Sequence, residues 1–431
     1  MPHHPRAPVR LRTALLLLWM IVVITIVWHA LLIAFDRERS TQAAAGLANM
    51  NTRSRTDNAV PSPGCPINSD DALQSFAVPD EIRQHPPVII DGVPPPGLAD
   101  HVFTQRPDFD YVDIRGTSLP GAVAVLNNAF VAQERAYVYN CDFQWTPGGC
   151  FGGNPPFDPI KHLDASRPRE FLSGTVVSIV QVWGYGFYHF FMEQFMRLAL
   201  VYDDVIADPS IRILAFTMGD ASNFLFDLAG IDPSRVISYN ENRVWFARRL
   251  IVPATTGCGQ ARSPAVQFFN RVFRQRWAAR NGAHLVERDA RLRIVVQKRS
   301  SSRSLSNHDD LVKALANTFP DADIVVYGPS ESMDDAVRKH YVADLIVAPH
   351  GAGISNVVFA DAARVAVIEI QPPTSNMADG SHNECHHQTV IALGARYERV
   401  VARSGTADTP MVVDVDEVIQ AARAIATTAR P

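Results

Sequence analysis

Hydrophobic and polar positions follow one repeating pattern over the last third of the chain. Short apolar runs, typical of buried strands, lie at residues 293–296, 323–326, 345–348, 365–370 and 397–401. Segments with helical spacing lie at residues 309–318, 333–341, 389–393 and 415–428, and a short helix follows Gly353. This alternation of strands and helices predicts a parallel sheet with helices on its faces.

A similar alternation precedes this region and predicts a second parallel sheet. We expect strands at residues 176–182, 211–215, 236–238 and 244–252, and helices at residues 187–202 and 223–229. A long helix at residues 264–280 carries a stripe of large apolar side chains, which we interpret as core and as a bridge between the two halves: Phe268, Phe269, Val272, Phe273 and Trp277. Residues 88–169 hold short strand-like pieces broken by proline and glycine, interpreted as decoration of the first half. The pattern predicts an α/β protein of two Rossmann-like lobes, at residues 88–285 and 286–431, with a cleft between them.

The N-terminal part follows neither pattern. Residues 13–35 are almost wholly apolar, which is long enough for the roughly 20 residues that a bilayer crossing needs. Arginines precede this run while the following residues carry no net charge, so we expect residues 1–12 in the cytosol and the rest in the lumen. The alternative is a cleaved signal peptide, but the run exceeds the usual apolar region of such peptides. Residues 36–87 are polar and Pro-bearing, which indicates a stem.

Composition narrows the class of protein. With 431 residues and 47% hydrophobic positions, the chain is long enough for a sizeable core, and its net charge of −4 gives no reason to expect nucleic acid as a partner. Five cysteines would lie in an oxidising compartment if the lumenal topology is right. Cys141 and Cys150 flank a turn and are the best candidates for a local disulfide.

The strand at residues 345–348 leads into a turn almost without side chains, formed by His350, Gly351, Ala352 and Gly353. Backbone N–H groups at the following helix start would attract an anion such as a nucleotide phosphate. Asn356 would lie beside that anion, and Glu369, near the end of the next strand, could accept hydrogen bonds from a ribose. The alternative is that the glycines serve to pack strand against helix, that His350 caps the helix, and that Asn356 is a packing amide.

A second turn follows the strand at residues 293–296 and carries Lys298, Arg299 and Arg303. Both turns should face the same edge, because ligands of open α/β sheets bind beyond the carboxyl ends of the strands. Arginine can hold phosphate oxygens with two parallel hydrogen bonds, so these cations suit a diphosphate. The alternative is a solvated basic loop.

Three segments, in this order, resemble glycosyltransferase family 61. They are YGFYHFFMEQFMRL at residues 185–198, VVQKRSSSRSLSNHDD at 295–310, and PHGAGISNVVFA followed by VIEI at 349–370. The resemblance implies a GT-B fold, a UDP-sugar donor in the C-terminal lobe, and a glycan or glycoprotein acceptor in the secretory pathway. It adds Asn307 to the donor-binding candidates. The chain departs from the family at Lys298, where a second arginine is expected, and at His308, where a glutamate is expected.

His189 and Glu193 are four residues apart on a predicted helix and therefore share a face. An inverting sugar transfer needs a base for the acceptor hydroxyl, and either residue could serve. The alternative is a core pair in which Glu193 holds the imidazole.

No metal site is expected. Residues 382–387 include three histidines and Cys385, but structural zinc sites usually separate their ligand pairs, so we interpret this segment as a loop near the cleft. The sequence Asp321, Ala322, Asp323 precedes its strand, whereas metal-dependent transferases place such acids after one.

Taken with the resemblance, these features predict an inverting type II glycosyltransferase of the Golgi or endoplasmic reticulum, with xylose or N-acetylglucosamine favoured and no metal cofactor. Two other classes remain open. One is a non-catalytic carbohydrate-binding protein on a decayed glycosyltransferase fold, and the other is a transferase of another group, such as sulfate, to polysaccharide.

Overall fold

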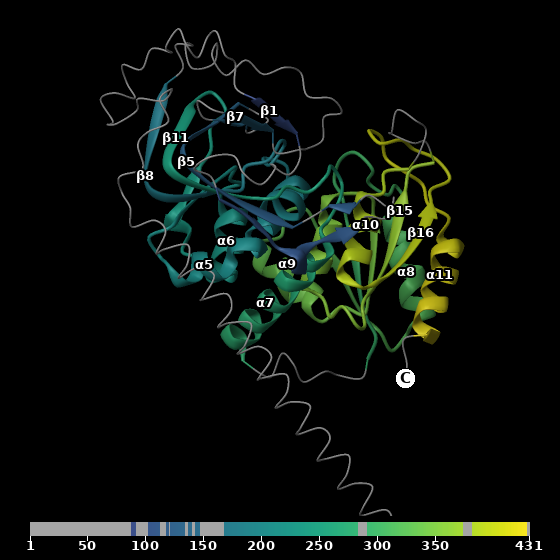
Figure 1. Cartoon of the computed structure of the whole chain (residues 1–431). Helices are drawn as coiled ribbons and strands as arrows, with labels where there is room; N and C mark the ends of the chain where they lie inside the picture. Colours follow the sequence, from purple (N-terminus) through teal and green to yellow (C-terminus); the bar gives the residue numbers. More distant parts are fainter. Residues whose placement is uncertain are drawn as a thin grey trace, which may run out of the picture. The chain divides into compact units, whose positions relative to one another are not determined.

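The structure, a computed structural model, describes residues 88–91, 102–112, 118–119, 121–133, 137–139, 143–146, 168–282, 291–373 and 382–428. They form an α/β structure with two main sheets (Figure 1). Within these residues, none of the helices has the length and apolar character that a membrane crossing requires. The predicted membrane helix at residues 13–35, the stem and the Cys141–Cys150 bridge lie outside the described residues.

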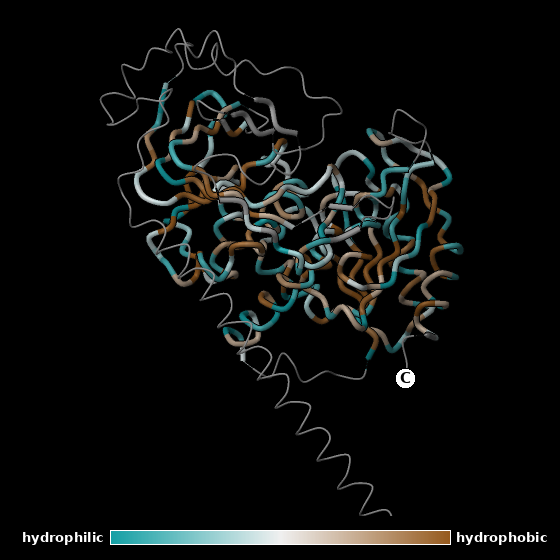
Figure 2. Tube along the Cα trace, viewed as in Figure 1, coloured by the Kyte–Doolittle hydropathy of each residue, from teal (hydrophilic) through white to brown (hydrophobic). Residues whose placement is uncertain are grey.

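The C-terminal sheet contains five parallel strands, at the positions that the apolar runs predict. They are β12 (Arg293–Gln297), β13 (Asp323–Tyr327), β14 (Leu345–Pro349), β15 (Ala366–Gln371) and β16 (Arg396–Val401). Every residue of β14 and β15 is buried, and Figure 2 shows the centre of this sheet as hydrophobic. Burial on both faces explains why these two strands are largely apolar runs.

Helices cover both faces of this sheet, because alternate strand residues point to opposite sides. On one face, Ile294 and Val296 share a core with α8 (His308–Thr318) and α11 (Val415–Thr428). On the other, Val295 and Ile346 share a core with three elements: α9 (Met333–Tyr341), η6 (Ala352–Phe359) and α10 (Cys385–Leu393).

The strand order is β13-β12-β14-β15-β16. After β12 the chain moves outward to β13, and it then returns to the other side of β12 to form β14. Doubly wound folds bind ligands at the point where the strand order reverses in this way. Here that point is the carboxyl end of β12 and β14.

The N-terminal sheet differs from the prediction of a parallel sheet. Four strands do run parallel: β8 (Arg169–Ser178), β9 (Arg212–Ala215), β10 (Val236–Ser238) and β11 (Val244–Pro253). However, β11 also pairs antiparallel with β5 (Ala122–Ala132), whose other neighbours are β2 (Val102–Gln105) and β6 (Tyr137–Tyr139).

The region predicted as decoration therefore extends this sheet. β7 (Phe143–Thr146) pairs antiparallel with β6 and parallel with β1 (Val88–Asp91). The links from β5 to β6 and from β6 to β7 are too short for a crossover, so these strands form an antiparallel meander. Smaller elements are η1 (Pro107–Phe109), η4 (Pro233–Arg235), and the pair β3 (Tyr111–Val112) and β4 (Ser118–Leu119).

The helix predicted at residues 187–202 forms in three pieces of different pitch. A π-type turn, η2 (His189–Gln194), leads into the 3-10 segment η3 (Phe195–Val201) and then α5 (Tyr202–Ala207). π-type turns are uncommon and occur frequently at functional sites.

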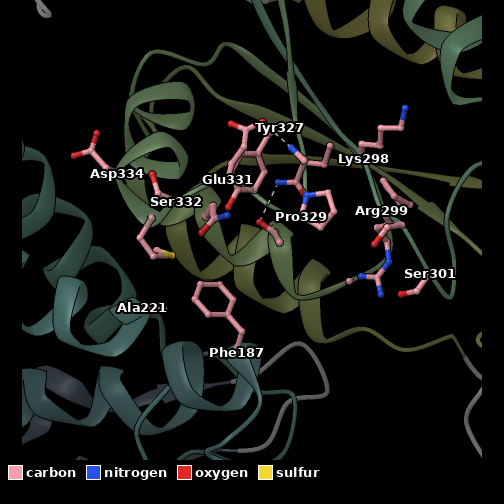
Figure 3. Close-up of a pocket in the computed structure, with 18 of the residues that line it drawn as sticks. Phe187, Ala221, Lys298, Arg299, Ser301, Tyr327, Pro329, Glu331, Ser332 and Asp334 are labelled. Atoms are coloured by element: carbon pink, nitrogen blue, oxygen red, sulfur yellow. Dashed lines mark hydrogen bonds between the residues drawn. The ribbon is translucent and has the colours of Figure 1, made fainter. Parts of the chain in front are cut away.

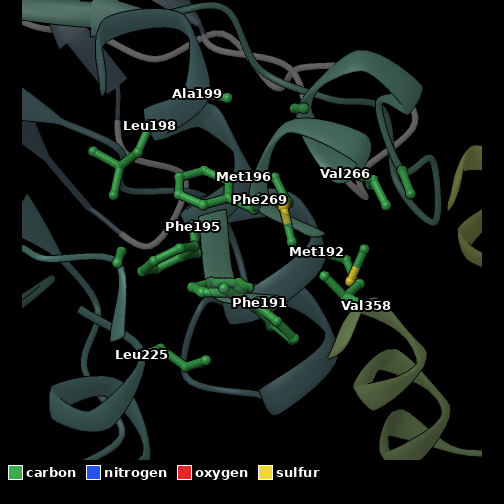
Figure 4. Packing of buried hydrophobic residues seen from close by; sticks show 14 of the residues in the cluster. Phe191, Met192, Phe195, Met196, Leu198, Ala199, Leu225, Val266, Phe269 and Val358 are labelled. Carbon is green, nitrogen blue, oxygen red and sulfur yellow. The ribbon is translucent and has the colours of Figure 1, made fainter. Parts of the chain in front are cut away.

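One aromatic core connects the helices of the two halves. The rings of Phe195 and Phe269 lie 5.0 Å apart, and those of Phe191 and Phe359 lie 5.6 Å apart (Figure 4). Phe269 belongs to α7 (Ser263–Asn281), the long helix predicted to bridge the halves, which packs against both η3 and η6. α6 (Asp220–Leu228) completes this layer.

Candidate functional site

A cavity of about 620 Å³ lies at the carboxyl ends of β12, β13 and β14, where the strand order reverses. Its volume is in the range of small-molecule sites. Residues 297–301, 327–329 and 331–334 line it, together with Pro349, Gly351, Gly353 and Asn356 (Figure 3). The N-terminal half adds Phe187, Asp220, Ala221 and Phe224. The cavity therefore lies between the two halves of the protein.

The two turns predicted to bind a diphosphate meet at this cavity. A Cβ atom on Gly351 would lie 1.8 Å from Arg299 Nη1, so the guanidinium lies directly against the glycine turn. The φ angle of Gly351 is 162°, an extended conformation that any residue adopts, so the constraint is spatial: a side chain here would displace the Arg299 guanidinium.

Position 353 holds a glycine for a different reason. A Cβ atom there would lie 2.8 Å from Gln297 Oε1, and Gln297 Nε2 donates to the Gly353 carbonyl at 2.9 Å. At this position the packing of strand against helix, which the sequence left open, explains the glycine.

Arg299 and Arg303 form an uncompensated pair of cations. Burial, followed by the charge of Arg303, lowers the pKa of Arg299. Neither guanidinium pairs with a carboxylate among the described residues, and Arg303 Nε is buried without a partner. Arg303 does not line the cavity, whereas Arg299 does. Two close cations without a counterion favour an anion beside them.

Lys298 is oriented differently. Its Nζ lies 3.5 Å from Asp309, and its side chain is half exposed. Figure 3 shows the amine directed away from Arg299 and Phe187. It contributes charge at the rim of the cavity.

Backbone N–H groups follow the glycine turn at the start of η6. Gly351 precedes this helix, and no side chain caps it. Uncapped first-turn N–H groups are available to an anion. Asn356 lines the cavity, and its Oδ1 is buried with no hydrogen-bond partner among the described residues. Ala352 begins η6 but does not line the cavity.

His350 and Glu369 lie behind the cavity wall. His350 Nδ1 donates to Glu369 Oε1 at 2.6 Å, and both side chains are almost fully buried. Tyr397 and Gln371 donate to the other carboxylate oxygen. Burial raises the pKa of Glu369, but the His350 hydrogen bond and the nearby histidine charges outweigh it and lower this pKa to about 2. Glu369 thus holds His350 in place from inside the protein and does not face the cavity, where the predicted ribose contact would be.

Asn307 also lies outside the cavity lining. Its Nδ2 donates to the Val413 carbonyl at 2.9 Å, and its Oδ1 accepts from the Val413 N–H at 3.2 Å. Both ends of the amide therefore join the loop after β12 to the segment before α11.

His189 and Glu193 form a hydrogen-bonded pair on η2. His189 Nδ1 lies 2.9 Å from Glu193 Oε2, with the imidazole partly exposed and the carboxylate buried. Gln181 Nε2 donates to Glu193 Oε2 at 3.1 Å, and the Gly259 N–H donates to Oε1 at 2.7 Å. Glu193 is fixed on both oxygens and orients the imidazole. Of the two, the geometry favours His189 as the residue that exchanges protons.

The residues that could hold a metal ion lie on α10 and the glycine turn. One ligand atom each from His350, Cys385 and His386 lie within 4.8 Å of one another. Residues 385–387, predicted as part of a loop, open helix α10. His387 takes no part in this group; it bonds to Glu384 and stacks on Tyr397.

Several cavity residues were not predicted. Tyr327 ends β13, Glu331 and Ser332 lie on the loop that follows, and Asp334 lies in the first turn of α9, where Ser332 and Asp335 form a capping box. The Ser-x-x-Asp pattern was readable as a helix start. The carboxyl end of β13 lies at the same edge of the sheet as that of β12, so the rule on strand ends predicts residues from this loop in the cavity. Phe187, Asp220 and Phe224 carried no such signal, because their contribution depends on how the two halves pack.

A second cavity, of about 630 Å³, lies in the N-terminal half. Aromatic and polar side chains line it together, among them Tyr185, Tyr239, Asn242, Arg243 and Trp245. Tyr185 is 55% exposed and lies four residues before His189.

Comparison with known proteins gives one family. Residues 187–367 match the family described as Glycosyltransferase 61. The matched region runs from the π-type turn with His189 to β15, and it includes both turns of the first cavity. A search of curated proteins finds no match to the chain.

Proposed function

Because residues 187–367 belong to glycosyltransferase family 61, the chain is a glycosyltransferase, and we propose that it transfers a sugar from a UDP-sugar to a glycan or glycoprotein with inversion. The family accounts for the reaction class, a donor sugar and a glycan acceptor. The donor nucleotide, the stereochemistry of transfer, the roles of individual residues and the cellular location are our proposals.

One observation carries the donor site. Arg299, without a carboxylate partner among the described residues, lies against Gly351 at the strand-order reversal. A diphosphate placed there would accept hydrogen bonds from the guanidinium and from the first N–H groups of η6. Arg303 would add longer-range positive charge, and Tyr327 and Asn356 would contact the nucleoside. Xylose and N-acetylglucosamine remain the favoured sugars through the family resemblance.

The base would be His189. With Nδ1 held by Glu193, Nε2 is the atom that would take the proton of the acceptor hydroxyl. The acceptor oxygen then bonds to the anomeric carbon as the bond from that carbon to the diphosphate oxygen breaks. UDP leaves with the electron pair of that bond, and Arg299 stabilises the added charge.

The acceptor would occupy the second cavity. Sugar rings present apolar C–H faces and polar edges, and this cavity offers the exposed Tyr185 ring beside Asn242 and Arg243. The closeness of Tyr185 to His189 in the chain supports this position.

The two halves with the donor cavity between them support the GT-B assignment. The apolar run at residues 13–35 supports a single type II anchor, with the catalytic part in the Golgi or endoplasmic reticulum lumen. Arginine and backbone N–H groups at the donor site support diphosphate binding without a metal ion.

One observation favours a non-catalytic binding protein instead. Lys298 pairs with Asp309 at the cavity rim and its amine is directed away from Arg299, so the site has one inward cation where the family pattern leads us to expect two.

A panel of UDP-sugars separates these functions. The purified full-length chain is incubated with each donor, and released UDP is measured for the wild type, His189→Gln and Arg338→Gln. Arg338 is exposed on α9 and does not line either cavity. We expect UDP release with one donor from the wild type and from Arg338→Gln, and strongly reduced release from His189→Gln. Binding of UDP-sugars without turnover would identify a binding protein, and binding of a sulfate-carrying nucleotide alone would identify another transferase.

A further inference from the structure

Three potential metal ligands meet behind the glycine turn. His350 follows β14, whereas Cys385 and His386 open α10, so the fold brings together residues that are far apart in the chain. Their ligand atoms lie within 4.8 Å of one another, and the rings of His350 and His386 have centroids 4.7 Å apart. The site is held by two separate elements on the same face of the C-terminal sheet.

His386 lacks a hydrogen-bond partner where one is expected. Its side chain is 2% exposed, and its Nδ1 is buried with no hydrogen bond among the described residues. Buried polar atoms are almost always paired, with protein, water or an ion, so an orphan nitrogen needs an explanation. A metal ion bound at a free ring nitrogen would be such a partner.

His350 has the arrangement that is typical of metal-bound histidines. Its Nδ1 donates to the Glu369 carboxylate at 2.6 Å, and Glu369 is fixed in turn by Tyr397 and Gln371. In metal sites such a carboxylate fixes the tautomer and makes the other ring nitrogen a better ligand.

Cys385 is a free thiol that opens α10 beside His386. A cysteine binds a metal ion as the thiolate, and the charge of the ion stabilises that form.

We propose that His350, Cys385 and His386 bind a zinc ion. Two imidazoles and a thiolate are ligands that zinc prefers, whereas magnesium and calcium require oxygen ligands. Binding replaces the thiol proton, so each zinc ion bound releases a proton from Cys385 to solvent. The three ligands leave a fourth coordination position. The ion ties α10 to the glycine turn and so fixes His350 behind the donor cavity. This role is separate from diphosphate binding, and it revises the expectation that no metal is bound.

Metal content and cobalt spectra test this site directly. The full-length chain is purified without chelators, and zinc is measured by mass spectrometry of the element. The protein is then stripped and loaded with Co²⁺, whose thiolate bond gives a charge-transfer band in the near ultraviolet. The variants are Cys385→Ser and His386→Asn, with His387→Asn as a matched control on the same helix.

We expect about one zinc ion per chain in the wild type and in His387→Asn, together with the cobalt–thiolate band. The band should be absent in Cys385→Ser, and zinc content should fall in both ligand variants. Circular dichroism shows whether those variants remain folded. If they do not, the zinc content and the cobalt spectrum of the wild type decide whether the site exists.

A wild-type chain that takes up no zinc and gives no thiolate band would overturn the proposal, as would equal zinc content in folded Cys385→Ser and His386→Asn. A parallel UDP titration keeps this result distinct from the proposed function. The two measurements are independent. A chain that binds UDP but no zinc overturns only the zinc site, and a chain that binds zinc but no UDP overturns only the proposed donor site.

Discussion

Replacing Arg299 by glutamine removes the guanidinium that lies against the glycine turn. Among the described residues, this side chain makes one hydrogen bond, from Nε to the Ser302 carbonyl at 2.8 Å, and has no carboxylate partner. The free energy of unfolding should therefore change little. Hydrogen bonds to a charged group contribute about 1.5–3 kcal/mol, so the loss of the bonds to a diphosphate should weaken UDP affinity by about 10- to 150-fold.

The assay is an equilibrium titration of UDP and of uridine into the wild type, Arg299→Gln and Arg338→Gln. Arg338→Gln removes the same charge from an exposed site on α9 and controls for net charge. UDP affinity should fall in Arg299→Gln alone, and uridine affinity should be unchanged in both variants. Unchanged UDP affinity in folded Arg299→Gln would refute the diphosphate site. An equal loss of affinity in Arg338→Gln would show that the loss comes from net charge and not from contact with the diphosphate.

Three further outcomes follow from other contacts. Gly351→Ala places a methyl group 1.8 Å from the Arg299 guanidinium, so UDP affinity should fall as in Arg299→Gln. The double variant should bind UDP little more weakly than either single variant, and additive losses would contradict this coupling. Glu193→Gln should lower kcat by about 10²–10⁴-fold through the orientation of His189, with UDP affinity retained, and a retained kcat would exclude that role. Burial lowers the pKa of His340 to about 4 from its usual 6.5, so the unfolded chain binds more protons between these values, and stability should fall by up to about 3 kcal/mol as the pH drops through this range. Urea unfolding of His340→Gln should show a smaller fall over the same pH range, and an identical slope would contradict the buried neutral state.

The C-terminal sheet could be predicted well because its central strands, β12, β14 and β15, are buried on both faces. A strand such as β14 must be apolar throughout, and the glycine turn after it marks the boundary to a helix. The convergence of Arg299 and Gly351 also followed from the rule on strand ends. The N-terminal sheet was harder, since β5 and β11 pair over many residues that are distant in sequence, and neither strand shows its direction locally.

The candidate site was only partly readable for the same reason. Glu369 was expected to contact a ribose, but both of its oxygens are occupied inside the protein: His350 bonds to Oε1, and Tyr397 and Gln371 bond to Oε2. The sequence argues against a metal site at Cys385 and His386 because the two residues are contiguous. The third ligand, His350, follows strand β14, and only the folded protein brings it close to the start of α10.

A structure of the chain with UDP bound tests the central claim most directly. We predict the diphosphate within hydrogen-bond distance of the Arg299 guanidinium and of the first N–H groups of η6, at the ends of β12 and β14. UDP in the cavity formed by Tyr185 and Trp245, or a diphosphate turned away from Arg299, would contradict the account.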